Sequence, residues 1–129
     1  MNTLPQTPER DLKIRLKKFS LRILKLYDSI PRHGSAQIIG RQLARSGTSP
    51  GAQYREACRA KSNADFVSKI EGALQELDES LYWFELLAEG NYVPGSRLLP
   101  LQGETNELIS ILVTIVRKVK ARGRRVKKG

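Results

Sequence analysis

The chain has 129 residues, with 23 Lys and Arg against 13 Asp and Glu, which gives a formal net charge of +10. With 40% hydrophobic and 28% charged residues, this length suits one globular domain with one core and excludes a wholly disordered chain. A single Cys and a single His exclude an internal disulfide, a thiol-rich zinc fold and a multi-histidine metal centre. No apolar run approaches the ~20 residues that a membrane span needs.

The first predicted element is a helix over residues 8–30. Apolar residues recur there at intervals of four and three, a spacing typical of one core-facing stripe: Leu12, Leu16, Phe19, Ile23, Leu26 and Ile30. Pro31 ends the helix. The amino-terminal stretch MNTLPQTPERD carries two acids and no apolar stretch, so it resembles neither a secretory signal nor a transit peptide. We therefore expect a cytoplasmic protein.

The second helix is predicted to start at Ser35 as its N-cap and to carry a glycine-rich interruption at residues 47–51. Pro50 lacks an amide hydrogen and clashes one turn back, so we expect a kink or break there. The residues expected to face inward are Ile38, Ile39, Leu43, Ala44, Tyr54, Ala57 and Cys58.

The third helix is predicted to open at Ser62, where Asp65 completes a variant capping box, and to end at Gly90–Asn91. Its predicted inward face consists of Phe66, Ile70, Ala73, Leu74, Leu77, Leu81, Phe84 and Ala88.

A fourth helix follows the Pro94–Gly95 turn, starts between Ser96 and Pro100, and runs to about Ala121, where Gly123 ends it. Its predicted inward face consists of Leu101, Leu108, Leu112, Ile115 and Val119. No segment alternates with period two between hairpin turns, so the sequence predicts an all-α, antiparallel, up-down four-helix bundle with a kinked second helix. The bundle domain is expected over residues 1–121 and a flexible basic tail over residues 122–129.

Charge is sorted along the chain. Residues 1–61 hold 13 basic and 4 acidic side chains, residues 62–107 hold 2 and 9, and residues 108–129 hold 8 and 0. Such segregation favours the binding of a polyanion to part of the surface, and nucleic acid is the first candidate for that polyanion. The alternative is that the basic residues only solvate helix faces. That alternative explains the stretch from Arg117 to Lys128 less well, because like charges crowd there without a counter-charge.

Some apolar residues fall outside the predicted core stripes. At about 100° per residue, Ile14, Leu21 and Leu24 lie opposite the core stripe of the first helix, among lysines. The third helix has Trp83 and Leu87 beside its core face, and the fourth helix likewise has Ile109, Ile111, Val113 and Val116. Surplus apolar faces of this kind predict self-association, with scattered surface hydrophobes as the alternative. The predicted interface residues are Ile14, Leu21, Leu24, Trp83, Leu87, Ile111 and Val113.

Catalytic patterns are not found in the sequence. The Gly40–Gly51 stretch has no lysine after a glycine, so it is not a phosphate-binding loop. His33 lies alone in a turn, and Cys58 has no histidine placed to activate it. The acidic residues of the third helix fit a solvated face or a partner surface better than a set of general acids. We therefore predict no enzyme, no metal and no cofactor; an enzyme of unrecognised type would need a cleft with perturbed carboxylates.

Three stretches are more specific than periodicity: RQLARSGTSPGAQYREA at 41–57, SNADFVSKI at 62–70 and ALQELDESLYWFELL at 73–87. With these stretches the chain resembles, over about residues 12–121, the bacterial four-helix-bundle family first met as proteins encoded by intervening sequences within 23S ribosomal RNA genes. The same family includes the accessory variability determinant of diversity-generating retroelements. The resemblance implies a ring-like homopentamer with no assigned catalytic activity. For the retroelement branch it also implies binding of RNA or DNA and docking on a reverse transcriptase.

Charge placement, not a family motif, provides the candidate binding residues. We expect phosphate contacts from three helices and the tail, with Tyr54 and Tyr92 as the only aromatics near a ligand. The candidates are Lys13, Lys17, Lys18, Arg22, Lys25, Arg41, Arg45, Arg55, Arg59, Arg117, Lys118, Lys120, Arg122, Arg124, Arg125, Lys127 and Lys128. A protein-interaction scaffold whose basic surface meets an acidic or RNA-loaded partner remains a second hypothesis.

Overall fold

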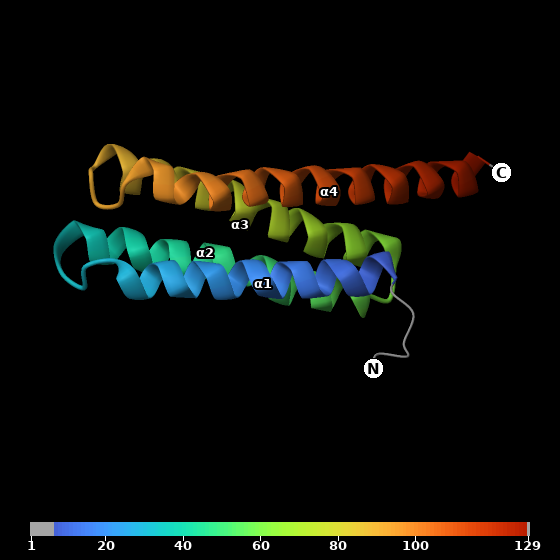
Figure 1. The fold of residues 1–129 in the computed structure, drawn as a ribbon. Helices are drawn as coiled ribbons and strands as arrows, with labels where there is room; N and C mark the ends of the chain where they lie inside the picture. Colours follow the sequence, from blue (N-terminus) through green and yellow to red (C-terminus); the bar gives the residue numbers. More distant parts are fainter. Residues whose placement is uncertain (1–6, 129) are drawn as a thin grey trace.

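The computed structural model describes the backbone of residues 7–128 and the side chains of residues 7–124. It contains α1 (Pro8–Ser29), α2 (Gly34–Cys58), α3 (Asn63–Glu89) and α4 (Gly95–Lys128), and no strand occurs in the described range. Consecutive helices run in opposite directions and pack side by side (Figure 1). The predicted all-α four-helix bundle is confirmed. Within the described part of the chain, no helix is long and apolar enough to cross a membrane.

The helix ends follow local capping chemistry. Thr7 caps α1, because its hydroxyl accepts a hydrogen bond from the amide of Arg10 at 3.1 Å. The predicted cap of α3 is confirmed, since the Ser62 hydroxyl accepts from the Asp65 amide at 3.0 Å. The predicted cap of α2 is wrong: His33 is the N-cap residue, without a side-chain bond. Ser35 lies inside α2, and its hydroxyl bonds the hydroxyl of Tyr92 instead.

Helix α2 continues through Pro50, so the predicted break is absent; the kink stays a prediction. Pro50 is buried, and the turn before it packs closely on α1. A Cβ atom on Gly47 would lie only 2.7 Å from Cγ1 of Ile23. Tertiary packing of this kind outweighs the local cost of proline, because most helix stability in proteins comes from packing.

The core stripe predicted for α1 is confirmed, since all its residues from Leu12 to Ile30 are buried. Ile70, Leu77 and Phe84 of α3 and Leu108 and Leu112 of α4 meet it in one cluster. The expectation for Ile38 is wrong: its side chain is 67% exposed. Gly40 and Leu43 are buried, and two residues before Gly40 the helix has rotated by about 200°, which carries Ile38 to the outer face.

Helix α4 is longer than predicted. It continues past Ala121 and Gly123 to Lys128, so residues 122–128 are its last two turns and not a separate tail. Gly123 does not have a positive φ, and a helical glycine costs only about 1 kcal/mol relative to alanine. The surrounding Arg and Lys residues are good helix formers and interact favourably with the negative end of the helix dipole.

Candidate nucleic-acid interface

Charge is divided between the helices. In α3 the only basic residue is Lys69, and its outer face carries exposed Glu71, Asp78, Glu85 and Glu89. Helices α1, α2 and α4 carry most of the basic side chains. The bundle therefore presents one acidic helix and three helices with positive surface.

Four of the predicted basic residues of α1 are exposed: Lys17, Lys18, Arg22 and Lys25. None of them has a carboxylate within 4.0 Å among the side chains that the structure describes. Lys13 differs, because its ammonium lies 3.3 Å from the carboxylate of Glu9 one turn away. The outer face of α1 is thus positive and mostly available to an anion.

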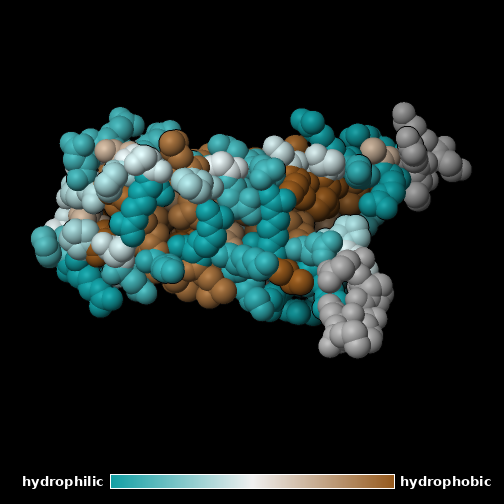
Figure 2. Space-filling model, viewed as in Figure 1, coloured by the Kyte–Doolittle hydropathy of each residue, from teal (hydrophilic) through white to brown (hydrophobic). Residues whose placement is uncertain are grey.

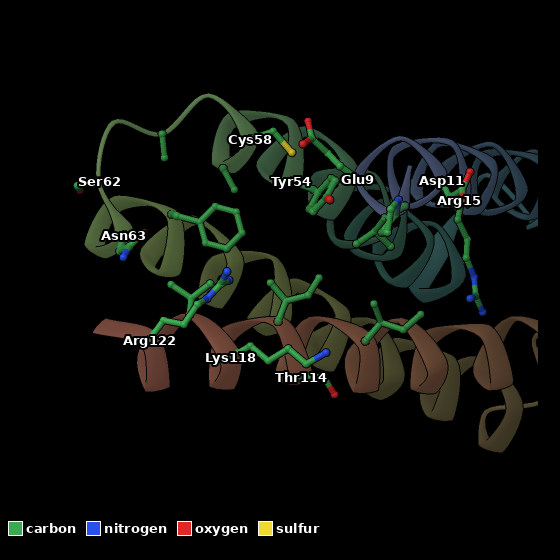
Figure 3. Close-up of a pocket in the computed structure, with 18 of the residues that line it drawn as sticks. Glu9, Asp11, Arg15, Tyr54, Cys58, Ser62, Asn63, Thr114, Lys118 and Arg122 are labelled. Carbon is green, nitrogen blue, oxygen red and sulfur yellow. The ribbon is translucent and has the colours of Figure 1, made fainter. Parts of the chain in front are cut away.

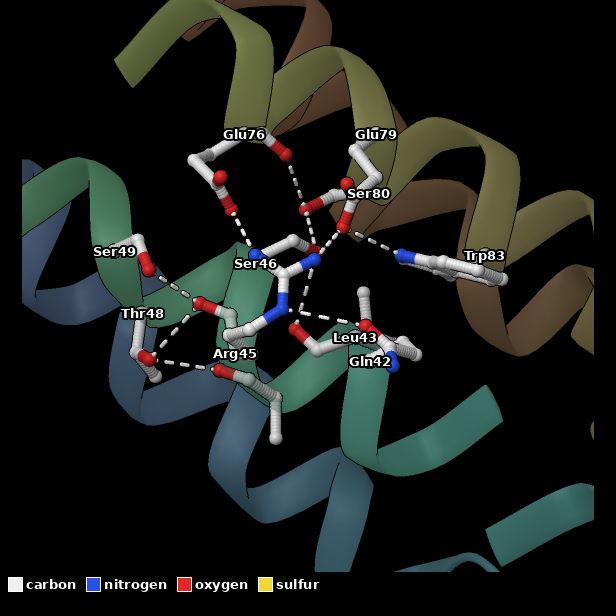
Figure 4. Close-up of polar contacts among 11 residues, drawn as sticks. Gln42, Leu43, Arg45, Ser46, Thr48, Ser49, Glu76, Glu79, Ser80 and Trp83 are labelled. Carbon is white, nitrogen blue, oxygen red and sulfur yellow. Dashed lines mark hydrogen bonds and ion pairs between the residues drawn. The ribbon is translucent and has the colours of Figure 1, made fainter. Parts of the chain in front are cut away.

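The predicted residues of α2 divide into two groups. Arg41, Arg55 and Arg59 are exposed and have no ion pair with any described carboxylate. Arg45 instead donates to Glu76 at 2.7 Å and also to Glu79, which in turn accepts from the indole of Trp83 at 3.0 Å (Figure 4). Arg45 therefore links α2 to α3 inside one protomer, an arrangement that charge placement along the sequence does not reveal.

Helix α4 carries exposed Arg117, Lys118, Arg122 and Arg124. Lys120 lies 3.4 Å from the carboxylate of Glu71 on α3. The side chains of Arg125, Lys127 and Lys128 lie outside the described residues. The part of α4 that is described still extends the positive surface to the end of the bundle where the C-terminus lies (Figure 1).

At that same end, an open groove of about 900 Å³ separates the first turns of α1 from the last turns of α4. Its lining includes apolar Leu12, Phe66, Ile111, Ile115 and Val119. Lys61, Lys118 and Arg122 also line it, and Figure 3 shows the last two extending from α4. In Figure 2, hydrophobic surface is visible between α4 and α1 toward this end. The volume is within the range of ligand sites, roughly 300–1,000 Å³.

Tyr54 and Cys58 lie in the wall of this groove (Figure 3). Burial raises the pKa of the Tyr54 hydroxyl, and burial also raises the pKa of the Cys58 thiol. Both groups therefore stay protonated at neutral pH, and the thiol is not an activated nucleophile. Tyr54 is almost fully buried, so Tyr92 is the more accessible of the two aromatics predicted near a ligand.

Metal-ligating side chains do not gather in the described part of the chain: no group of three or more His, Cys, Asp or Glu is placed to hold an ion.

The predicted interface residues have different surroundings. Leu21 is 58% and Leu24 42% exposed, while Ile14, Trp83, Ile111 and Val113 are half-buried. Leu87 was predicted at the interface between copies, but the structure places its side chain fully buried in the protomer core. It lies one turn after Phe84 on the same face, and its carbonyl accepts hydrogen bonds from the amides of Tyr92 and Val93. The sequence does not single out Tyr82 and Leu99 as exposed, and it places the exposed Ile38 inward. Apolar periodicity alone does not give the solvent exposure of these side chains.

Comparisons with known proteins agree with this fold. The chain is 32% identical to a protein of unknown function from the S23 ribosomal protein family of Bacteroides thetaiotaomicron, whose crystal structure it matches with a TM-score of 0.78. The match covers 86% of this chain and 99% of the other. No curated protein sequence matches the chain. The sequence pattern of the 23S rRNA-intervening sequence protein family matches residues 11–114. The chain therefore belongs to the 23S rRNA-intervening sequence protein family.

Proposed function

We propose that this protein is a non-enzymatic, self-associating four-helix protein that binds RNA or DNA through phosphate contacts. The observation that carries the proposal is the set of exposed basic residues without an ion pair among the described side chains. It comprises Lys17, Lys18, Arg22, Lys25, Arg41, Arg55, Arg59, Arg117, Lys118, Arg122 and Arg124.

These side chains suit the sugar-phosphate backbone more than the bases. Arginine can bridge two phosphate oxygens with its planar fork, and lysine acts as a mobile point charge. A contact of this kind positions the ligand but carries no sequence information. We therefore expect little discrimination between sequences.

Self-association strengthens such binding. Several copies of a weak basic surface, held together, contact one long polyanion at a high effective concentration. The family resemblance implies five copies, and the exposed Leu21 and Leu24 support association in general. Affinity for nucleic acid is then expected to depend on assembly.

A charge-reversal pair tests the proposal. Arg55→Glu with Arg122→Glu removes two positive charges at the groove end of the bundle and adds two negative ones. We expect the affinity for a 30-nucleotide RNA, measured by fluorescence anisotropy, to fall about tenfold or more.

The matched control is Arg32→Glu with Arg97→Glu, which makes the same charge change at the opposite end, before α2 and at the start of α4. We expect this control to retain its affinity within about threefold. Equal losses in both variants would mean that net charge alone drives binding, and unchanged affinity in the first variant would reject the site.

The second candidate is a protein-interaction scaffold. The family assignment leaves room for this candidate, since the structural relative is a protein of unknown function. The acidic outer face of α3 favours it, because that face suits a protein partner rather than a nucleic acid. A partner that stays bound in a pull-down from nuclease-treated lysate supports the scaffold. Loss of every partner after nuclease treatment supports nucleic-acid binding.

More specifically, we propose that the protein is an accessory of a reverse transcriptase in a diversity-generating retroelement. The net charge of +10 supports this form, because a polymerase accessory must handle template RNA and its copy. A neighbouring reverse-transcriptase gene with paired template and variable repeats is the expected genomic setting. A gene placed inside a 23S ribosomal RNA gene would favour the scaffold instead.

A further inference from the structure

The groove between the first turns of α1 and the last turns of α4 has an apolar floor that includes one partly accessible aromatic ring. Leu12, Tyr54 and Val119 are buried in this floor. Phe66, from the first turn of α3, lines the same groove but is only half-buried. Its apolar spacing places Phe66 in the core, so the sequence does not mark it as a ligand contact. Aromatic side chains of this kind are the surfaces on which proteins stack unpaired bases.

Cations border the groove and come from two different elements. Lys118 and Arg122 extend from α4 (Figure 3), and Lys61 lies in the loop between α2 and α3. All three are exposed, and none has a carboxylate within 4.0 Å among the side chains that the structure describes. A polyanionic strand that contacts the loop and α4 at the same time therefore passes along the groove.

The α1 wall of the groove has the opposite charge. Glu9 and Asp11 line it, and the Glu9 carboxylate lies 3.3 Å from the ammonium of Lys13. Asp11 is exposed and has no ion pair with any described basic side chain. Carboxylates repel phosphates, but they accept hydrogen bonds from the N–H groups of bases. The phosphates of a bound strand are therefore directed to the α4 side, and its bases are directed toward α1.

The remaining lining suits a flat heterocycle better than a simple hydrocarbon chain. Exposed hydroxyl and amide groups line the groove beside the apolar floor: Ser62, Asn63, Ser110 and Thr114. Hydroxyl and amide groups can bond the edge of a base, while the floor contacts its faces. A fatty acid would use the floor, but it would need neither these polar groups nor cations from two elements.

We infer that this groove binds an unpaired base of a single-stranded nucleic acid, stacked on Phe66, while Lys61, Lys118 and Arg122 contact the adjoining phosphates. The inference rests on the proposed function, because it keeps the phosphate contacts and adds a contact to the base. A base inside a duplex is paired and stacked, so it enters such a groove only after costly extrusion. Preference for single strands over duplexes follows from this geometry.

The first test compares the two forms of nucleic acid on the full chain. Fluorescence anisotropy measures the affinity for an unstructured 30-nucleotide RNA and for the duplex of the same sequence. Phosphate contacts alone favour the duplex, because it carries more charge per length. Base stacking reverses this order, so we expect the wild type to bind the single strand about fivefold tighter or more. A DNA strand of the same sequence is expected to show the same preference, because the groove contacts the base.

Phe66→Leu keeps an apolar side chain in the groove and removes the aromatic face. We expect its affinity for the single strand to fall about fivefold or more, and its affinity for the duplex to stay within about twofold. Tyr82→Leu is the matched control, because it removes an exposed aromatic side chain from the same helix outside the groove. It is expected to leave both affinities within about twofold. Circular dichroism verifies that both variants are folded.

Cys58 gives a readout that needs no substitution. It is the only cysteine of the chain and lies half-buried in the groove wall. Its alkylation by N-ethylmaleimide, followed by intact mass, therefore reports whether the groove is occupied. We expect the single strand, at about ten times its Kd, to slow alkylation of the wild type roughly tenfold. The duplex is expected to slow it less than about twofold.

Several outcomes would overturn the inference. They are a wild type that prefers the duplex, a Phe66→Leu variant that loses affinity for both forms equally or for neither, and alkylation of Cys58 that the single strand does not slow. Protection of Cys58 by palmitate or by higher protein concentration, but not by the strand, would assign the groove to an amphiphile or a second copy instead. Salt-dependent binding of the duplex without Cys58 protection would retain the proposed function while rejecting the base site. No binding of either form would reject both.

Discussion

Arg15 links α1 to α4 beside the groove, and these two helices contact each other less than any other contacting pair in the bundle does. Its guanidinium donates to both carboxylate oxygens of Glu104, at 2.8 and 2.7 Å, and to Glu107 at 2.8 Å. The hydrogen bonds from Arg15 lower the pKa of Glu104 and raise that of Arg15. This bidentate pair fixes the position of α4 against α1 and so the width of the groove.

A pH-dependent stability difference is expected from this pair. Because the folded-state pKa of Glu104 is lowered, its stabilisation is complete above the unfolded-state pKa and is lost as pH falls through the folded-state value. Glu104→Gln should lower the free energy of unfolding by roughly 1.5–3 kcal/mol at pH 7. In urea titrations, this difference should shrink below pH 4. Glu107→Gln, at an exposed site, should cost less than about 1 kcal/mol, and equal losses for both variants would contradict the assignment.

The contacts of individual side chains are the least predictable part of this structure from its sequence. Arg45 and Arg55 cannot be told apart in the sequence, but only Arg45 forms ion pairs, because α3 packs beside that turn of α2 and supplies the carboxylates. The sequence places Leu87 beside the core face of α3, but its side chain is buried in the same core cluster as Val93, whose amide bonds back to the Leu87 carbonyl. Both outcomes depend on contacts between elements, which periodicity within one helix does not contain.

At the scale of the elements, apolar spacing predicts the helices well. The core stripe of α1, the Ser62 cap and the end of α3 at Gly90 all follow from short-range chemistry. Pro50 and Gly123 lead to wrong predictions of a helix break and a helix end, because a proline or glycine lowers helix propensity only locally. Packing on α1 outweighs the cost at Pro50, and strong helix formers continue α4 through Gly123. The missed features are therefore the continuity of α2 and the length of α4.

The glycines of α2 give a test of that packing. Gly47→Ala places a Cβ atom 2.7 Å from the buried side chain of Ile23, so that side chain or the two helices must shift, and we expect a destabilisation of about 1–3 kcal/mol. Gly103→Ala in α4 meets no atom within 4 Å, so it should stabilise the protein by about 0.5–1 kcal/mol. Thermal or urea unfolding measures both. A neutral or stabilising Gly47→Ala would show that α1 and α2 are not held at this distance.

At the scale of the whole molecule, charge segregation is the property on which the proposed function rests. The sequence predicts the family and the positive surface, and the first is confirmed by the match over residues 11–114. It could not predict that α1 and α3 lie at opposite corners, because that depends on the order in which the four helices pack. This arrangement places the acidic outer face of α3 on the opposite side of the bundle from the positive outer face of α1.

The most direct test of nucleic-acid binding is the salt dependence of RNA affinity for the wild-type protein. If each protomer contacts ~5 phosphates, a plot of log affinity against log salt should have a slope of about −3 to −5 per protomer engaged. A slope of −4 corresponds to a roughly 250-fold loss of affinity for a fourfold increase in salt. An affinity that does not change with salt, or no binding at low ionic strength, would contradict the proposed function.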